Sequence, residues 1–214
     1  MIDYFTANRE LVLAALSQHL VLALVPVALA LVVAIPLGAL AARRGWVYPT
    51  LMGLAGVLYS VPSLALFVVL PSVLHTKMLD PRNVVVALTI YTAALLVRSV
   101  ADGLRSVDPT VVQAASAMGY RSVHRLVAVE LPVALPVLVA GVRSATVANI
   151  SMVSVGALIG VGGLGTLFTR GLQLRYLDPI LLGITLSVLL ALLADILLVL
   201  VQRRLTPWAR PGAA

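Results

Sequence analysis

The chain has 214 residues, of which 61% are hydrophobic and 11% are charged, and its 15 Lys and Arg outnumber its 8 Asp and Glu. Soluble domains are about 45–50% apolar and about 25% charged, so this chain has too little polar surface for a water-soluble enzyme. Cysteine is absent, which excludes disulfides, thiolate catalysis and cysteine-based metal sites. The composition therefore predicts an all-α integral membrane protein.

Five apolar runs are expected to form the membrane spans, since a span needs about 20 apolar residues. They cover residues 20–42, 48–74, 84–97, 131–158 and 179–201. The second run is interrupted at residues 60–63 (Ser-Val-Pro-Ser), so it is either one broken helix or a helix followed by a re-entrant segment. Residues 1–19 form a polar or interfacial N-terminal segment of one membrane domain, residues 1–214.

The basic residues predict how these spans are oriented. With the N-terminus outside, nine basic residues lie at the cytoplasmic ends of the spans and five lie at the outer ends. The cytoplasmic set is Arg43, Arg44, Arg98, Arg105, Arg121, Arg125, Arg203, Arg204 and Arg210, and the outer set is Arg9, Lys77, Arg82, Arg170 and Arg175. Because arginine and lysine are retained on the cytoplasmic side, the C-terminus is expected in the cytoplasm. The positive charge is then a topology signal, and no nucleic-acid partner is expected.

A polar cytoplasmic stretch, residues 107–130, separates the third and fourth spans. Asp108-Pro109 is a typical helix start, with an acid at the N-cap and proline in the first turn. The small residues that follow would let another surface approach closely. The stretch predicts two short helices joined at Gly119. They could form a simple packing hairpin or a docking site for another protein.

The spacing of this stretch resembles the signature of binding-protein-dependent ABC importer permeases, which reads Glu-Ala-Ala, three residues, Gly, nine residues, Ile-x-Leu-Pro. The matching residues here are Gln113, Ala114, Ala115, Gly119, Val129, Leu131 and Pro132. Gln replaces Glu at 113 and Val replaces Ile at 129. The segments 59–66, 135–143 and 160–165 further resemble the osmoprotectant branch of that family.

The resemblance implies a type I importer permease fold, with residues 113–119 in a coupling helix that docks on a separate ATPase. ATP and Mg²⁺ would be held by that subunit, and no cofactor would be bound by this chain. A second permease copy or paralogue, an extracytoplasmic binding protein and the lipid of the cell membrane would be the other partners. Since aromatic residues are only 5% of the chain, solute selectivity is expected mainly in the binding protein.

Several polar residues inside the apolar runs are candidates for the translocation path. They are Ser60, Pro62 and Ser63 at the interruption of the second run, and Asn149, Ser151 and Ser154 in the fourth. Ordinary hydrogen bonding between helices is the alternative for the residues of the fourth run.

A glycine-rich segment, residues 156–171, follows the fourth run and is expected at the outer mouth. Gly160, Gly162, Gly163 and Gly165 occur in a Gly-x-Gly-x-x-Gly pattern, but no strand precedes it and the next acid comes too early for a dinucleotide site. The segment could gate the path, meet the binding protein or serve helix packing.

Arg143 and Asp195 lie inside the fourth and fifth apolar runs, at comparable heights above the cytoplasmic ends of their helices. A charge at membrane depth costs about 2.5–3.5 kcal/mol on insertion scales, so such residues usually face the bundle interior and pair. We expect the two to pair with each other, as a structural lock rather than a substrate contact.

Nothing in the sequence favours an enzyme. The single lysine, Lys77, is followed by Met78, so no phosphate-binding Gly-Lys-Ser/Thr loop exists, and the three histidines are too scattered for a metal site. The expected function is the permease subunit of an ATP-driven importer of quaternary ammonium osmoprotectants, namely glycine betaine, choline or carnitine. The alternatives are an importer of methionine or another polar amino acid, and a membrane scaffold that transports nothing.

Overall fold

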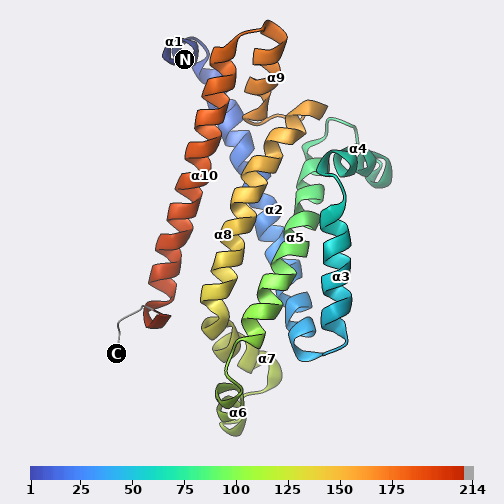
Figure 1. Ribbon diagram of the computed structural model, residues 1–214, viewed down its shortest axis with the longest axis vertical. Helices are drawn as coiled ribbons and strands as arrows, with labels where there is room; N and C mark the ends of the chain where they lie inside the picture. Colours follow the sequence, from blue (N-terminus) through green and yellow to red (C-terminus); the bar gives the residue numbers. More distant parts are fainter. Residues whose placement is uncertain (210–214) are drawn as a thin grey trace.

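The computed structural model describes residues 1–209, and Arg210, one of the basic residues expected in the cytoplasm, lies outside them. These residues form helices and connecting turns and contain no strand (Figure 1). The helices are α1 (Ile2–Ala7), α2 (Arg9–Arg43), α3 (Val47–Ser60), α4 (Ser63–Leu74), α5 (Pro81–Arg105), α6 (Pro109–Ala117), α7 (Ser122–Arg125), α8 (Leu131–Gly156), α9 (Gly165–Leu174) and α10 (Leu177–Leu205). A π-helical turn, η1 (Leu126–Glu130), and two 3-10 turns, η2 (Ala157–Ile159) and η3 (Pro207–Ala209), complete the description.

Four of the five spans that the sequence predicts are single long helices, and the fifth is present if a bent helix pair counts as one span. Within residues 1–209, α2, α5, α8 with its preceding turns, and α10 are each long and apolar enough to cross a bilayer. The second apolar run forms the pair α3 and α4, which are bent by 97° at residues 61–62, as in a broken span or a helix followed by a re-entrant segment. In Figure 1, α3 stands upright beside α5, whereas α4 lies across the top of the two.

The first span is longer than expected, because α2 begins at Arg9 and continues for 35 residues. Pro26 and Pro36 lie inside it without ending it. A stripe of small residues, Ala30, Ala34 and Gly38, is buried against α5. A Cβ atom at Gly38 would lie 2.6 Å from a Val100 side-chain carbon, so only glycine permits this approach of the two helices.

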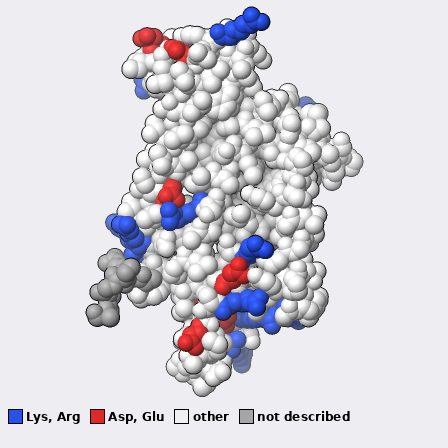
Figure 2. Space-filling model, viewed as in Figure 1, with Lys and Arg blue, Asp and Glu red and all other residues white. Residues whose placement is uncertain are grey.

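The two ends of the bundle differ in charge and in structure. α6 and α7 lie at one end, and the N-terminus lies with α9 at the other (Figure 1). Figure 2 shows that most basic side chains on the visible face gather in the half that holds α6 and α7. The positive-inside rule therefore places α6 and α7 in the cytoplasm and the N-terminus outside.

Arg98 departs from its expected place at the cytoplasmic end of the third span. The helix does not stop at Arg98 but continues to Arg105. Seven further residues correspond to about 10 Å of helix, so Arg98 lies inside the span. The helix can continue because the guanidinium does not face the packed core; Arg98 is exposed on the side of α5 that lines a cavity.

Candidate functional site

The cytoplasmic segment begins with a helix whose first turn is capped by its own sequence. The Asp108 carboxylate accepts hydrogen bonds from the Thr110 hydroxyl at 2.7 Å and from the Thr110 backbone N–H at 2.8 Å. These two hydrogen bonds hold the pKa of Asp108 below its usual range. Pro109 occupies the first turn, where its missing N–H would have no partner in any case. The start of α6 is therefore fixed locally.

The residues of the signature divide α6 into a buried side and an exposed side. Ala115 is 2% exposed and faces the bundle, whereas Gln113 and Ala114 are exposed. Val111 and Met118 are also exposed, and with Ala114 they follow the spacing of one helix face. The helix therefore presents an uncovered apolar face away from the bundle, at the cytoplasmic end.

Gly119 ends α6 in a conformation that requires glycine. Its φ is +87°, while a Cβ atom built on it would meet nothing within 4 Å, so backbone geometry and not space demands the glycine. The Gly119 N–H donates to the Ser116 carbonyl and the Tyr120 N–H donates to the Ala115 carbonyl. This pair of bonds is the Schellman motif, which stops a helix and reverses the chain.

The end of the signature carries the chain back into the membrane. Leu131 and Pro132 form the first turn of α8, and Pro132 stands where a helix tolerates proline. Val129 is half-buried in the π-helical turn, and Leu131 packs against the apolar core of the cytoplasmic half. The three residues thus fix the entry of α8.

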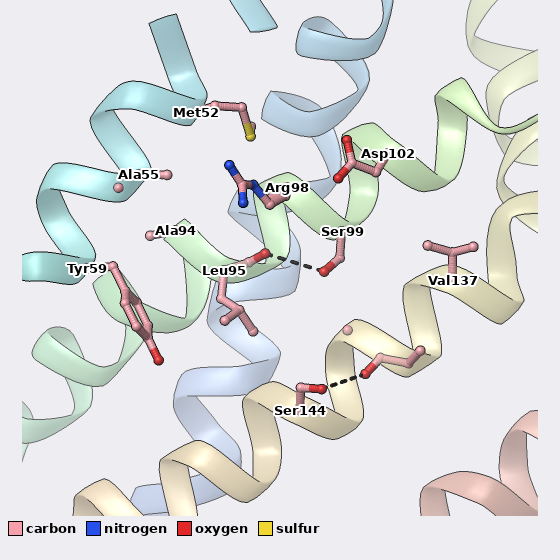
Figure 3. A pocket seen from close by; sticks show the side chains of 13 residues that line it. Met52, Ala55, Tyr59, Ala94, Leu95, Arg98, Ser99, Asp102, Val137 and Ser144 are labelled. Carbon is pink, nitrogen blue, oxygen red and sulfur yellow. Dashed lines mark hydrogen bonds between the residues drawn. The ribbon is translucent and has the colours of Figure 1, made fainter. Parts of the chain in front are cut away.

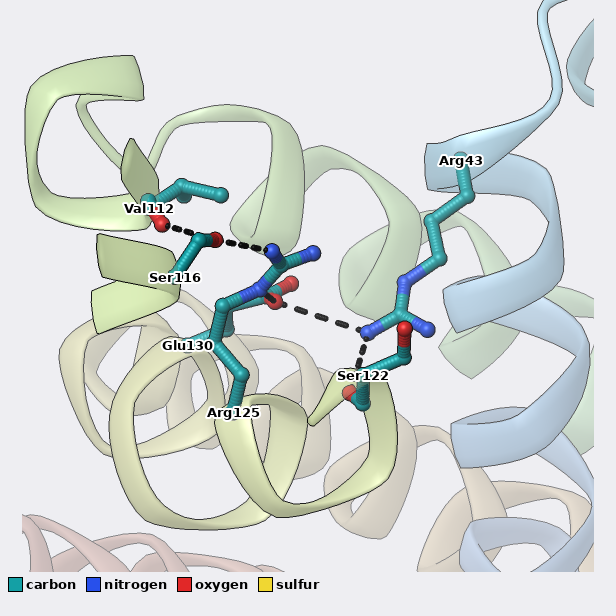
Figure 4. A network of polar contacts seen from close by, with 6 residues as sticks. All are labelled: Arg43, Val112, Ser116, Ser122, Arg125 and Glu130. Carbon is teal, nitrogen blue, oxygen red and sulfur yellow. Dashed lines mark hydrogen bonds and ion pairs between the residues drawn. The ribbon is translucent and has the colours of Figure 1, made fainter. Parts of the chain in front are cut away.

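Glu130, the variable position of the signature, joins the cytoplasmic helices to the bundle (Figure 4). Its side chain is buried, and its Oε1 accepts from Arg125 Nε at 2.7 Å and from Arg43 at 3.4 Å. Arg125 also donates to the Ser116 hydroxyl on α6, and Arg43 donates to the Ser122 carbonyl at 2.9 Å. One carboxylate therefore connects α6, α7, the start of α8 and the end of α2.

Sequence reasoning missed Glu130 because the signature leaves its position open. One feature of the sequence could have pointed to Glu130. It is the only acid between Asp108 and the fourth span, and four arginines of the cytoplasmic set lie nearby in the chain.

The interruption of the second span is held by a tyrosine from α5. The Tyr91 hydroxyl donates to the Val61 carbonyl at the bend, and the Tyr91 ring meets Tyr59 edge-on with centroids 6.0 Å apart. Ser60 and Pro62 are exposed at the bend and Ser63 is half-buried. The structure thus brings these predicted path residues together at one turn.

The polar residues of the fourth span do not form one line. Asn149 is 2% exposed; its Oδ1 accepts from the Thr92 hydroxyl at 2.9 Å and its Nδ2 donates to the Ala23 carbonyl at 3.2 Å. Asn149 therefore ties α8 to α5 and α2. Ser151 is exposed and Ser154 is half-buried, on other faces of α8 than Asn149.

The glycine-rich segment is packed against α2 at the outer end. Gly160 and Gly163 have φ values of +83° and +84°. A Cβ atom at Gly162 would lie 1.9 Å from a Gln18 side-chain oxygen, and one at Gly165 would lie 2.5 Å from the Ser154 carbonyl. Close contact, as well as backbone conformation, therefore requires these four glycines.

His19, which the sequence does not single out, anchors this segment. The ring is fully buried; Nδ1 accepts from the Leu164 N–H at 3.1 Å, and Nε2 lies 3.0 Å from the Ile150 carbonyl. Since a carbonyl only accepts, Nε2 carries the proton and donates. One histidine of α2 thus joins the glycine-rich turn to α8.

Arg143 and Asp195 lie together. Arg143 Nε donates to Asp195 Oδ1 at 2.8 Å, and a terminal nitrogen of the same guanidinium donates to Oδ2 at 2.9 Å. This two-pronged arrangement is the strongest geometry for an arginine and a carboxylate, and it connects α8 to α10. Its function in transport remains a prediction.

A cavity of about 630 Å³ lies between α3, α5 and α8 in the cytoplasmic half, on the opposite side of α5 from α2 (Figure 3). Its lining is mostly small or apolar, with Tyr59, Arg98, Ser99, Asp102 and Ser144 as the polar members. No group of three or more His, Asp or Glu able to hold a metal ion occurs among the described residues.

Comparison with known sequences gives consistent matches over nearly the whole chain. Residues 34–207 match the family model described as the binding-protein-dependent transport system inner membrane component. The chain is 32% identical to the carnitine transport permease protein OpuCD of Listeria monocytogenes, covering 97% of this chain and 92% of that protein. It is 34% identical to the osmoprotectant import permease protein OsmW of Salmonella typhimurium, covering 96% and 97%.

Comparison with solved structures agrees on the fold. A chain of the MetNI methionine ABC transporter in an inward-facing conformation superposes with a TM-score of 0.84, covering 94% of this chain and 98% of that chain. Its sequence identity is 22%, so this likeness speaks for the fold alone.

Proposed function

Since the chain belongs to the family of binding-protein-dependent transport system inner membrane components, we propose that it is the permease subunit of an ATP-driven importer of quaternary ammonium osmoprotectants. The substrate class rests on relatives of nearly equal length whose names specify carnitine, choline or osmoprotectants, at 28–34% identity. Such a subunit works as a multi-pass protein of the cell membrane.

The observation that carries the proposal is the uncovered apolar face of α6. Val111, Ala114 and Met118 are exposed at the cytoplasmic end, where no lipid would cover them. An apolar face rimmed by polar residues typically marks a protein interface, and a flexible methionine adapts to a partner's groove. The occupant is a separate ATPase subunit, which binds ATP and Mg²⁺ and hydrolyses the ATP, because this chain has no phosphate-binding loop.

Two further partners complete the machine. Alternating access needs two halves that move against each other, so a second permease, identical or paralogous, faces this one. A binding protein delivers the solute at the outer end, where the glycine-rich segment lies.

Importers of methionine or other polar amino acids are the alternative within the same fold. The structural likeness to the methionine transporter does not favour that substrate, since its identity is only 22%. A scaffold that transports nothing could also present a docking face, so retention of an ATPase through α6 is the observation that separates a transporter from it.

Uptake by the assembled complex tests the proposal. The permease is co-expressed with its ATPase and binding protein, reconstituted in liposomes, and supplied with labelled glycine betaine, carnitine, choline or methionine. We expect ATP-dependent uptake of at least one quaternary ammonium solute and none of methionine. Uptake of methionine alone would contradict the proposal and support the alternative, an importer of methionine.

The docking face is tested separately by co-purification of the ATPase. Met118→Asp places a charge in the proposed apolar interface, and Met78→Asp is the matched control, since both methionines are exposed but lie at opposite ends. We expect the first substitution to release the ATPase and the second to retain it. Equal retention would remove α6 as the docking site.

A further inference from the structure

The cavity between α3, α5 and α8 has the size of a small-molecule site. Its volume of about 630 Å³ falls within the 300–1,000 Å³ range of ligand pockets. Gly56 and Gly141 are among the small residues that line it, and a Cβ atom at Gly141 would lie 2.4 Å from the Ser99 hydroxyl oxygen. Gly141 therefore permits the close contact of α8 with α5 beside the cavity, whereas a Cβ atom at Gly56 would meet nothing within 4 Å.

Arg98 brings a positive charge into this cavity without a hydrogen-bonded or ion-paired partner among residues 1–209. Its side chain is exposed. The other arginine inside a span, Arg143, is bonded to Asp195. Asp102, one turn from Arg98 on α5, instead accepts from the Tyr48 hydroxyl at 2.7 Å.

An unpaired guanidinium at membrane depth is costly, and such residues usually face a water-filled cavity and mark a substrate path. The planar guanidinium matches a carboxylate, which it binds through two parallel hydrogen bonds. The chemistry that Arg98 selects is therefore a carboxylate on a small solute.

Tyr59 supplies an aromatic ring toward the other end of the same cavity. It comes from α3, is 47% exposed, and is braced edge-on by Tyr91. An exposed aromatic face attracts quaternary ammonium groups through cation–π interaction. Arg98 is two helical turns from Tyr91, about 10 Å along the axis, and helical side chains lean toward the N-terminus of their helix. Figure 3 shows the Arg98 side chain extending from α5 toward α3, with Tyr59 of α3 further along the cavity, past Ala94.

We propose that this cavity binds carboxylate-bearing quaternary ammonium solutes during transport, with Arg98 on the carboxylate and Tyr59 on the ammonium group. The proposal rests on the proposed function and deepens it. Choline carries the ammonium group but no carboxylate, so the permease itself separates carnitine from choline. Solute selectivity is then shared between the permease and the binding protein. The low aromatic content of this chain, taken alone, would place selectivity in the binding protein.

The test compares uptake of carnitine and choline by the complete reconstituted transporter. Arg98→Gln removes the carboxylate partner, and Arg105→Gln is the matched control on the same helix, outside the cavity. Charge-assisted hydrogen bonds contribute about 1.5–3 kcal/mol, so we expect carnitine uptake to fall about ten- to a hundredfold relative to choline uptake. Arg105→Gln should leave the ratio of the two rates unchanged.

Tyr59 is tested by two substitutions with opposite expectations. Tyr59→Leu removes the ring and should lower uptake of both solutes, whereas Tyr59→Phe keeps the ring and should preserve it. Unchanged uptake by Tyr59→Leu overturns the aromatic half of the site.

The outcomes separate this inference from the function on which it rests. A wild-type complex that imports neither solute overturns both. A wild type that imports both, with an unchanged carnitine-to-choline ratio in Arg98→Gln, overturns the cavity site alone. Should Arg98→Gln fail to retain the ATPase, Arg98→Lys carries the same test, because it keeps the charge and loses the planar fork. A smaller shift in the same direction supports the site, and an unchanged ratio overturns it.

Discussion

Replacing Glu130 with glutamine should uncouple ATP hydrolysis from transport. The substitution keeps the size of the side chain and removes the charge that holds Arg125 and Arg43. Since those two arginines join α6 and α7 to the end of α2, motion of the docking helix would no longer be passed fully to the bundle.

The distances set the size of the effect. The contact with Arg125 at 2.7 Å is a buried, charge-assisted hydrogen bond, and such bonds contribute about 1.5–3 kcal/mol. The contact with Arg43 is longer, at 3.4 Å, and the Arg43 side chain is 35% exposed, so it adds less than about 1 kcal/mol. We therefore expect Glu130→Gln to weaken the anchoring of the segment by about 2–3 kcal/mol, since an amide oxygen still accepts one weaker bond.

The assay measures solute imported and ATP hydrolysed by the same reconstituted complex. Glu130→Gln should lower import by up to about thirty- to a hundredfold, the equivalent of about 2–3 kcal/mol, while ATP hydrolysis persists, so that the ratio of the two falls. A double-mutant cycle with Arg125→Gln should show strong coupling, because either single substitution already removes the Arg125–Glu130 contact and only the Arg125–Ser116 hydrogen bond is left for the second to break.

Glu10→Gln is the matched control, since Glu10 is the chain's only other glutamate and is exposed on α2 toward the outer end. It should leave the ratio unchanged. If Glu130→Gln behaves like Glu10→Gln, or if the losses in the cycle simply add, the carboxylate does not connect the docking helix to the bundle.

Four further predictions follow from other parts of the molecule. Gly119→Ala should weaken ATPase retention, because a positive φ costs a residue with a Cβ about 1–2 kcal/mol, and Gly119→Asn should weaken it less; equal retention by both would contradict the backbone argument. His19→Ala should lower the melting temperature of the purified permease more than His19→Gln, since it strands the buried N–H of Leu164 at about 1–3 kcal/mol. Arg143→Gln and Asp195→Asn should show coupled, not additive, losses of thermal stability in a double-mutant cycle, and additive losses would discard the pair as a lock. The Asp108 cap has a folded pKa below its unfolded value, so its stabilisation of α6 should be full at neutral pH and disappear as acidification passes the folded pKa. Amide exchange in α6 should show this loss in the wild type and not in Asp108→Asn.

The cytoplasmic segment could be predicted from the sequence because its determinants are local. Asp108 and Pro109 start α6, and Gly119 ends it with a positive φ, which are properties of neighbouring residues in the chain. The positions of the spans could be predicted equally well, since the length of an apolar run reflects the thickness of the bilayer.

Apart from the Arg143–Asp195 pair, which was expected from two charges at comparable height, the residues that act across the bundle escaped prediction. Glu130 and His19 bind groups more than eighty residues away in sequence, which no spacing rule connects. Arg98 was expected at a span end because a charge usually stops an apolar run, yet the helix continues past it where a cavity receives the side chain. Asn149 could not be assigned to packing or path until its partners on α5 and α2 were known.

The sequence by itself determined that the chain crosses a membrane, how it is oriented, and which stretch carries the permease signature, since hydropathy, charge bias and helix caps depend on residues close in the chain. The sequence also predicted the Arg143–Asp195 pair, but only the tertiary structure decided that Asn149 is satisfied by α5 and α2 and that Arg98 is left open to a ligand. Pairing at membrane depth depends on helix packing, and packing brings Arg143 to Asp195 while leaving Arg98 facing an unfilled cavity.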